Sequence, residues 1–97
     1  MREPGLDGEC SLDLVRAELD RVDVQFIDLL KRRLELGVEA GRIKRKLGVP
    51  VEDSARENRA VAQARSWAAN AGLSEKEVEG IFRSLIALSR GAQQSQT

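Results

Sequence analysis

The fold is decided by residues 12–47, which read LDLVRAELDRVDVQFIDLLKRRLELGVEAGRIKRKL. Apolar side chains recur in this stretch at alternating spacings of three and four residues, the pattern of a helix that packs along one seam. The pattern continues for about five heptads and contains no proline. The seam positions are Leu12, Val15, Leu19, Val22, Phe26, Leu29, Arg33, Leu36, Ala40, Ile43 and Leu47.

A helix of about 36 residues would be about 54 Å long. Two shorter helices from the same chain cannot cover both ends of such a rod, whereas a second copy of the chain supplies a helix of matching length. We therefore expect an all-α fold with three helices per chain, one long and two shorter, that forms an intertwined helical homodimer.

Glycines and capping residues mark the predicted helix boundaries. Gly48 ends the long helix, and a second helix is expected from residue 53 or 54 to about residue 71, with Gly72 as its stop. Ser74 followed by Glu77 forms the capping box of a third helix. The apolar face of the third helix carries Val78, Ile81, Phe82, Leu85 and Ile86, and then Ser89.

Length and composition limit the class of protein. The 97 residues form one domain, expected over residues 12–93, with a flexible arm over residues 1–11 and a frayed tail over residues 94–97. Sixteen basic and sixteen acidic residues give no net charge, which argues against a nucleic-acid partner held by phosphate attraction. The sequence has no histidine and one cysteine, which excludes histidine acid–base chemistry, Cys/His metal sites and disulfide scaffolds. It shows neither a membrane span nor a signal peptide, so we expect a cytoplasmic protein without a membrane partner.

Polar residues interrupt the seam of the long helix. Arg33 occupies a seam position, and because burial of an unpaired guanidinium is costly, an anion should meet it. Lys44 lies almost in line with Arg33, and Gly37 and Gly41 lie between them. A glycine inside a helix costs about 1 kcal/mol relative to alanine, so two on one face suggest that space is kept open. This arrangement predicts a slot for a small anion.

The same kind of interruption recurs elsewhere in the sequence. Glu57 heads the apolar stripe of the second helix, and Ser89 and Gln93 continue the stripe of the third. Arg16 lies beside the seam near the start of the long helix, where an antiparallel partner would bring it to the far half of the other long helix. Three cations, one carboxylate and two neutral hydrogen-bonding groups suit a small dicarboxylate that bears a hydroxyl or an ether.

Each of these residues also has a structural explanation, which the sequence leaves open. Arg33 would extend its guanidinium to solvent from a wide dimer seam or pair with a carboxylate of the partner. Lys44, in a basic run near a helix C-terminus, would serve the helix dipole and solubility. Asp53 would be a helix cap and Glu57 the second half of a capping box. Arg16 would be solvated, and the polar end of the third helix would simply face water.

The chain resembles the all-helical chorismate mutases, in their monofunctional single-domain form, over residues 12 to about 93. The resemblance rests on an ordered set of segments and not on any one of them. These are LVR at 14–16, Asp23, LLKRR at 29–33, GRIK at 41–44, PVED at 50–53, RE at 56–57, IF at 81–82, Ser89 and Gln93.

The resemblance implies how the substrate would be bound. Arg33, with Ser89 nearby, would bind one substrate carboxylate, and Arg16 from the other subunit would bind the second. Lys44 and Gln93 would point at the ether oxygen. Each active site would therefore be shared between the two subunits of a homodimer.

The resemblance also implies the reaction. Glu57 would hold the ring hydroxyl, helped by Asp53 and Arg56. The reaction would be the Claisen rearrangement of chorismate to prephenate in phenylalanine and tyrosine biosynthesis, a pericyclic step that needs no cofactor or metal. Lys44, Gln93, Glu57 and Arg33 would be the catalytic residues, acting by restricting the substrate conformation and stabilising charge on the ether oxygen.

Two alternatives remain at this point. An isochorismate pyruvate lyase of the same fold would use the same cations, although Asp53, Arg56 and Glu57 follow the mutase pattern. A non-enzymatic helical dimerisation module would bind no small molecule, and it would leave the two helix glycines unexplained.

Overall fold

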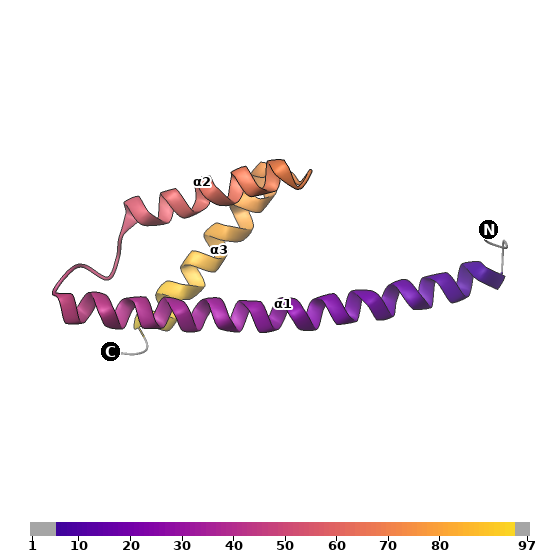
Figure 1. Ribbon diagram of the computed structural model, residues 1–97, viewed down its shortest axis with the longest axis horizontal. Coiled ribbons are helices and arrows are strands. Elements are labelled where there is room, and N and C mark those ends of the chain that lie inside the picture. Colours follow the sequence, from indigo (N-terminus) through magenta and orange to yellow (C-terminus); the bar gives the residue numbers. More distant parts are fainter. Residues whose placement is uncertain (1–5, 95–97) are drawn as a thin grey trace. The chain divides into compact units, whose positions relative to one another are not determined.

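The computed structural model describes the backbone of residues 6–94 and the side chains of residues 11–93. Over these residues the chain forms three helices and no strand, as predicted: α1 (Leu6–Leu47), α2 (Ser54–Asn70) and α3 (Glu75–Gln94) (Figure 1). The chain divides into two compact units, unit 1 (Met1–Arg33) and unit 2 (Leu34–Thr97). The boundary between them falls within α1, and unit 2 holds the last part of α1 together with α2 and α3.

α1 begins earlier than the sequence predicted. Residues 6–11, which were expected to belong to a flexible arm, are helical. Helix growth is cooperative, so extending an existing helix by one more turn is far easier than starting one, even through a glycine such as Gly8. The other residues of the predicted arm, 1–5, and residues 95–97 of the predicted tail lie outside the described part of the chain.

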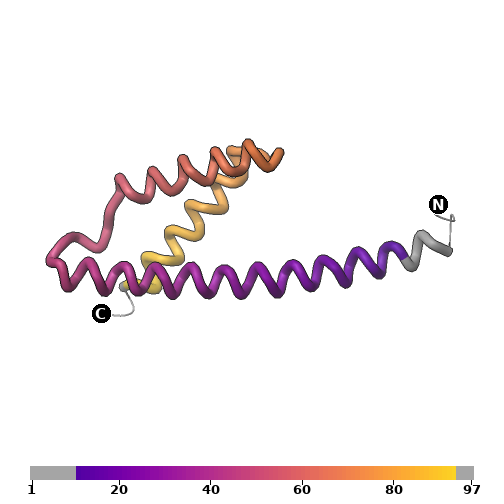
Figure 2. The backbone as a smooth tube through the Cα atoms, in the orientation of Figure 1, coloured from indigo at the N-terminus to yellow at the C-terminus, as the bar shows by residue number. Residues whose placement is uncertain are grey.

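Glycines in a left-handed conformation end the first two helices. Gly48 has a φ of 72° and Gly72 a φ of 74°, values that favour glycine because it has no side chain. After α2, the Leu73 N–H donates to the Ala68 carbonyl at 2.8 Å, which closes the helix end in the way expected of a glycine stop. Figure 2 traces residues 48–53 as the non-helical connection from α1 to α2.

Side-chain caps begin the second and third helices. Asp53 is the cap of α2, and its Oδ1 accepts from the Arg56 N–H at 3.0 Å. The Ser74 hydroxyl accepts from the Glu77 N–H at 3.3 Å just before α3. These bonds satisfy N–H groups that a helix start leaves without an internal partner. Both helix starts therefore confirm the boundaries predicted from capping residues.

The buried core of unit 2 lies between α2 and α3, which pack against each other. Among the side chains that the structure describes, the buried apolar ones are Val61, Ala64 and Ala68, all from α2 and none larger than valine. Small side chains let the two helices approach closely. On the outside of this pair, Arg65 of α2 bonds Glu79 of α3 at 3.0 Å.

The large apolar side chains of the α1 seam are exposed, and Ala40 is half-buried. In unit 1, exposure of the seam side chains runs from 49% at Leu12 to 64% at Leu29. In unit 2, Leu36, Ile43 and Leu47 are also exposed. None of the described helices is long and apolar enough to be a candidate membrane span. The long helix thus presents to solvent the stripe that the sequence predicts to be a packing surface.

Candidate functional site

The last turns of α3 lie against the glycines of α1 within unit 2. Gln93 donates through Nε2 to the Gly37 carbonyl at 2.7 Å. A methyl group added at Gly41 would stand 3.3 Å from Cγ of Gln93, and one added at Gly37 would stand 3.4 Å from Oγ of Ser89. The glycines therefore allow α3 to approach α1. The side chains next to the glycines are thus Ser89 and Gln93, two of the predicted site residues, and the slot for a small anion stays a prediction.

Lys44 lies on the same part of α1. It follows Gly41 by three residues, so the two share a helix face. Its half-buried ammonium donates to the Val51 carbonyl at 3.2 Å, in the connection that leads to α2. An ammonium carries three N–H groups and this bond uses one, so Lys44 is held in place while keeping donors for a ligand.

Glu57, in the first turn of α2, pairs with Arg90 of α3. Nε of Arg90 donates to one carboxylate oxygen at 2.9 Å, and Nη2 donates to the other oxygen. These hydrogen bonds, and the negative charge of Glu57, raise the pKa of the Arg90 guanidinium, so it stays charged. The capping-box interpretation of Glu57 is not what the structure has, because Asp53 caps the helix and the Glu57 side chain engages α3.

Arg90 is the residue of this region that the sequence reasoning missed. It is 33 positions from Glu57 in the sequence, so no local pattern links the two. It also lies on the polar end of α3, where a charged residue is expected on any helix that ends in solvent. Only the packing of α2 against α3 brings the pair together.

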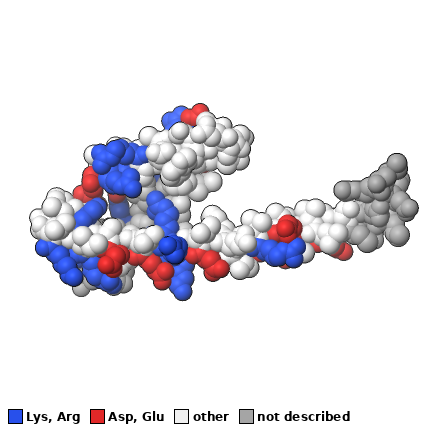
Figure 3. Space-filling model, viewed as in Figure 1, with Lys and Arg blue, Asp and Glu red and all other residues white. Residues whose placement is uncertain are grey.

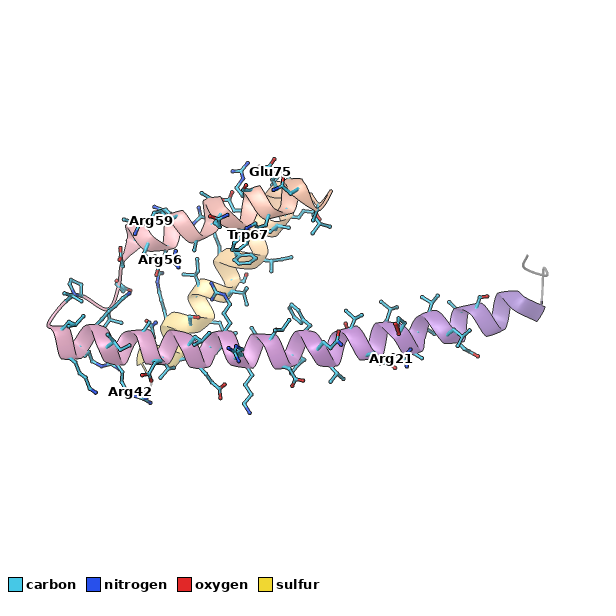
Figure 4. The ribbon with its side chains drawn as sticks, in the orientation of Figure 1. Arg21, Arg42, Arg56, Arg59, Trp67 and Glu75 are labelled. Atoms are coloured by element: carbon cyan, nitrogen blue, oxygen red, sulfur yellow. The ribbon has the colours of Figure 1, made fainter. Side chains whose placement is uncertain are left out.

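The remaining predicted residues of α2 have simpler surroundings. Asp53 is half-buried and acts as the helix cap, which confirms the capping interpretation, and its role in binding stays a prediction. Arg56 is exposed at the amino-terminal end of α2, near Arg59 (Figure 4). Lysine and arginine side chains gather on the face of unit 2 drawn in Figure 3.

Unit 1 contains the other two predicted cations. Arg16 is exposed and Arg33 is half-buried. Both lie on α1, where a rise of about 1.5 Å per residue places them about 25 Å apart. That distance exceeds the length of a small dicarboxylate, so one molecule cannot contact both arginines of the same chain.

Unit 2 contains four of the predicted site residues. Ser89 and Gln93 lie against the glycines of α1, Lys44 bonds the Val51 carbonyl, and Glu57 bonds Arg90 of α3. Two N–H donors, on Lys44 and Gln93, are held by backbone carbonyls, and a carboxylate is held by Arg90. Such an arrangement can bind a polar small molecule that offers both an anionic oxygen and a hydrogen-bond donor.

Comparison with known proteins identifies relatives with a named activity. The sequence profile of the chorismate mutase type II family matches residues 15–94. The chain is 35% identical over 75 residues to the 4-amino-4-deoxychorismate mutase of Streptomyces venezuelae, covering 77% of this chain and 73% of that protein. It is 33% identical over 75 residues to the T-protein of Enterobacter agglomerans, and 33% identical over 69 residues to the T-protein of Haemophilus influenzae. Those matches cover 77% and 71% of this chain but 20% and 18% of the two T-proteins. No solved structure matches the chain significantly.

Proposed function

The chain belongs to the chorismate mutase type II family, as the sequence resemblance predicted, and on this premise we propose that it converts chorismate to prephenate as a homodimer with shared active sites. Enzymes of this family are isomerases. The observation that carries the proposal is the contact of Ser89 and Gln93 with the α1 glycines. Lys44 follows Gly41 by three residues and bonds the Val51 carbonyl, and Glu57 bonds Arg90 of the same α3 segment. Prephenate formation would place the enzyme in aromatic amino-acid biosynthesis. The cytoplasmic location stays a prediction.

The proposed mechanism uses Lys44 and Gln93 as fixed donors. The rearrangement breaks the ether C–O bond and forms a C–C bond within one molecule, while negative charge builds up on the ether oxygen. Donors that are already oriented stabilise such charge without reorganising. The backbone carbonyls of Val51 and Gly37 provide that orientation, since each accepts a hydrogen bond from one of the two side chains.

The carboxylates of the substrate would be bound by arginines from two chains. We assign one carboxylate to Arg33 with Ser89, and the other to Arg16 of the second subunit. The separation of about 25 Å along α1 supports the use of two chains, because one substrate cannot reach both arginines of a single helix. Holding both carboxylates restricts the flexible enolpyruvyl arm to its reactive conformation, and such positioning is a large part of catalysis in a unimolecular reaction.

The ring substituent would be held by Glu57, with Asp53 and Arg56 nearby at the start of α2. Glu57 is supported in this role by its position, because Arg90 fixes its carboxylate beside the α3 segment that contacts α1. Each carboxylate oxygen accepts two hydrogen bonds, so a carboxylate that is paired with arginine can still accept one from a ligand hydroxyl.

A second candidate substrate is 4-amino-4-deoxychorismate. The relative from Streptomyces venezuelae is named for a mutase of that compound, and it matches three quarters of this chain. The two compounds differ in the ring substituent alone, so Glu57 would contact the difference between them.

Turnover distinguishes the candidates. Purified protein would be incubated with chorismate, its loss followed by ultraviolet absorbance, and the product identified by mass spectrometry. Prephenate supports the proposal, whereas pyruvate release from chorismate or isochorismate indicates lyase chemistry. No turnover or binding of chorismate, isochorismate or the 4-amino compound would contradict an enzymatic role and favour the dimerisation module.

Lys44 offers a sharp test because α1 contains a matched control. Lys44→Ala should lower turnover by about 10²–10³-fold, the usual cost of removing one fixed donor to developing charge. Lys46, in the same last turn but exposed, provides the control, and Lys46→Ala should leave turnover within about twofold of wild type. Near-wild-type turnover of Lys44→Ala with intact helicity would refute its role.

The homodimer is supported by the exposed seam of α1, and two valines test it. Val22 is a seam position and 51% exposed, whereas Val24 lies on the opposite side of the helix and is 63% exposed. If a second chain covers the seam, Val22→Glu should shift the species seen in sedimentation velocity towards monomer, and Val24→Glu should not. Equal behaviour of the two variants would contradict a dimer built on this seam.

A further inference from the structure

Arg90 places a permanent positive charge behind the carboxylate of Glu57. The pair joins α3 to α2 through two guanidinium nitrogens, Nε and Nη2, and both carboxylate oxygens. This bidentate geometry is the one in which arginine holds a carboxylate most firmly. The Glu57 side chain is 21% exposed, so it is partly screened from water. Glu52, the other acid near Arg90, is 4.0 Å away and 69% exposed, and is the weaker partner.

Arg90 also belongs to the α3 segment that contacts α1. It directly follows Ser89 and lies three residues before Gln93, whose side chains meet Gly37 and Gly41. A ligand that contacts these residues and Glu57 would therefore lie close to the Arg90 guanidinium. At Glu57 the ligand would meet a carboxylate whose charge is neutralised by Arg90, and not an isolated negative charge.

We propose that Arg90 is a positioning and specificity-determining residue, which holds Glu57 and makes the site favour a neutral hydroxyl over an ammonium on the substrate ring. This inference rests on the proposed function. A hydroxyl needs only an accepting oxygen, which the paired Glu57 still provides. An amine on a saturated carbon is protonated at neutral pH, and repulsion from the nearby guanidinium offsets part of its attraction to the carboxylate.

The test compares kcat/KM for chorismate and for 4-amino-4-deoxychorismate. The wild-type chain should prefer chorismate. Arg90→Met removes the charge and keeps an unbranched side chain that reaches as far as the arginine Nε. It should lower the chorismate-to-amine ratio by about tenfold or more, because the charge of Glu57 is then no longer neutralised and attracts the ammonium. Part of the change should be a lower KM for the amine, which a general loss of structure would not produce.

Three further variants make the test specific. Arg83 lies two turns earlier on α3 and pairs with Glu79, so Arg83→Met removes a comparable ion pair away from Glu57 and should keep the wild-type ratio. Arg90→Lys keeps the positive charge and should retain the preference within about threefold. Arg90→Gln is neutral but can still hydrogen-bond Glu57, and it should lower the ratio as Arg90→Met does. It replaces Arg90→Met in the comparison if circular dichroism shows that Arg90→Met folds poorly.

The outcomes separate this inference from the proposed function. Conversion of neither compound by the wild-type chain overturns both. Conversion of chorismate with a ratio that stays within about twofold in the folded neutral variants overturns the role of Arg90 and leaves the mutase standing. A wild-type preference for the amine also overturns the role of Arg90. A lowered ratio in Arg90→Met or Arg90→Gln, with Arg83→Met unchanged, supports it.

Discussion

Replacing Gly41 by alanine tests the reason for a glycine in the middle of α1. Alanine is favoured over glycine inside a helix by about 1 kcal/mol. The added methyl group would stand 3.3 Å from Cγ and 3.5 Å from Cδ of Gln93, so the glutamine has to shift. That shift strains the 2.7 Å bond from Gln93 to the Gly37 carbonyl, and losing such a bond costs about 0.5–1.5 kcal/mol.

The gain in helix propensity and the strain on the Gln93 hydrogen bond should nearly cancel in the free energy of unfolding. Only the displacement of Gln93 should affect turnover. We expect the free energy of unfolding of Gly41→Ala to stay within about 1 kcal/mol of wild type. Its turnover of chorismate should fall about tenfold, because the Gln93 amide is displaced from its catalytic position. The assays are urea unfolding followed by far-ultraviolet circular dichroism, at one fixed chain concentration, and the absorbance assay of chorismate.

Gly80 of α3 supplies the control. A methyl group there meets nothing within 4 Å, so Gly80→Ala should raise the free energy of unfolding by about 1 kcal/mol and leave turnover unchanged. If Gly41→Ala gains as much stability as Gly80→Ala and turns over chorismate as the wild type does, the close approach of α3 is not the reason for the glycine.

Three further changes have defined outcomes. Arg33→Ala should mainly weaken substrate binding and stabilise the seam, and an unchanged KM would count against its assigned carboxylate. Asp53→Ala should lower the free energy of unfolding by about 1 kcal/mol through loss of the helix cap, while Asp53→Asn keeps most of it; equal losses would exclude capping as the cause. The hydrogen bond from Arg83 lowers the pKa of Glu79 in the folded chain. The stabilisation that the ionised Glu79 provides is therefore present above its pKa in the unfolded chain, and it is lost as the pH falls through its pKa in the folded chain. Glu79→Gln should therefore lower the melting temperature near neutral pH but not in strong acid, and the same deficit at both would contradict the linkage.

Local signals in the sequence were sufficient for the helix boundaries of α2 and α3. Gly72 and Ser74 act through bonds to residues only a few positions away, so their effects can be predicted without knowledge of the tertiary structure. The start of α1 at Leu6 could not be predicted in this way. Polar residues and Gly8 argue for an irregular arm, and the cooperativity of a long helix outweighs them.

The sequence predicted which residues have defined polar contacts in this region better than it predicted the partners of those contacts. Lys44 and Gln93 were expected to face a ligand, and the structure adds that each is already bonded to a backbone carbonyl. The glycines were identified as unusual from the sequence, and the structure adds that Ser89 and Gln93 of α3 lie against them, while the slot for a small anion stays a prediction. The Arg90–Glu57 pair was missed, since a contact between distant segments leaves no periodicity in the sequence.

The wide spacing of Arg16 and Arg33 on α1 gives the proposed enzyme a genetic property. Pure Arg16→Ala and pure Lys44→Ala dimers would each carry the same defect in both sites. In a mixed dimer, one site would collect both defects and the other would be intact. If subunits exchange freely in an equal mixture of the two variants, about half of the two-fold symmetric dimers are mixed. Each mixed dimer has one intact site, so about one site in four is restored. Two defective alleles expressed in one cell would complement each other.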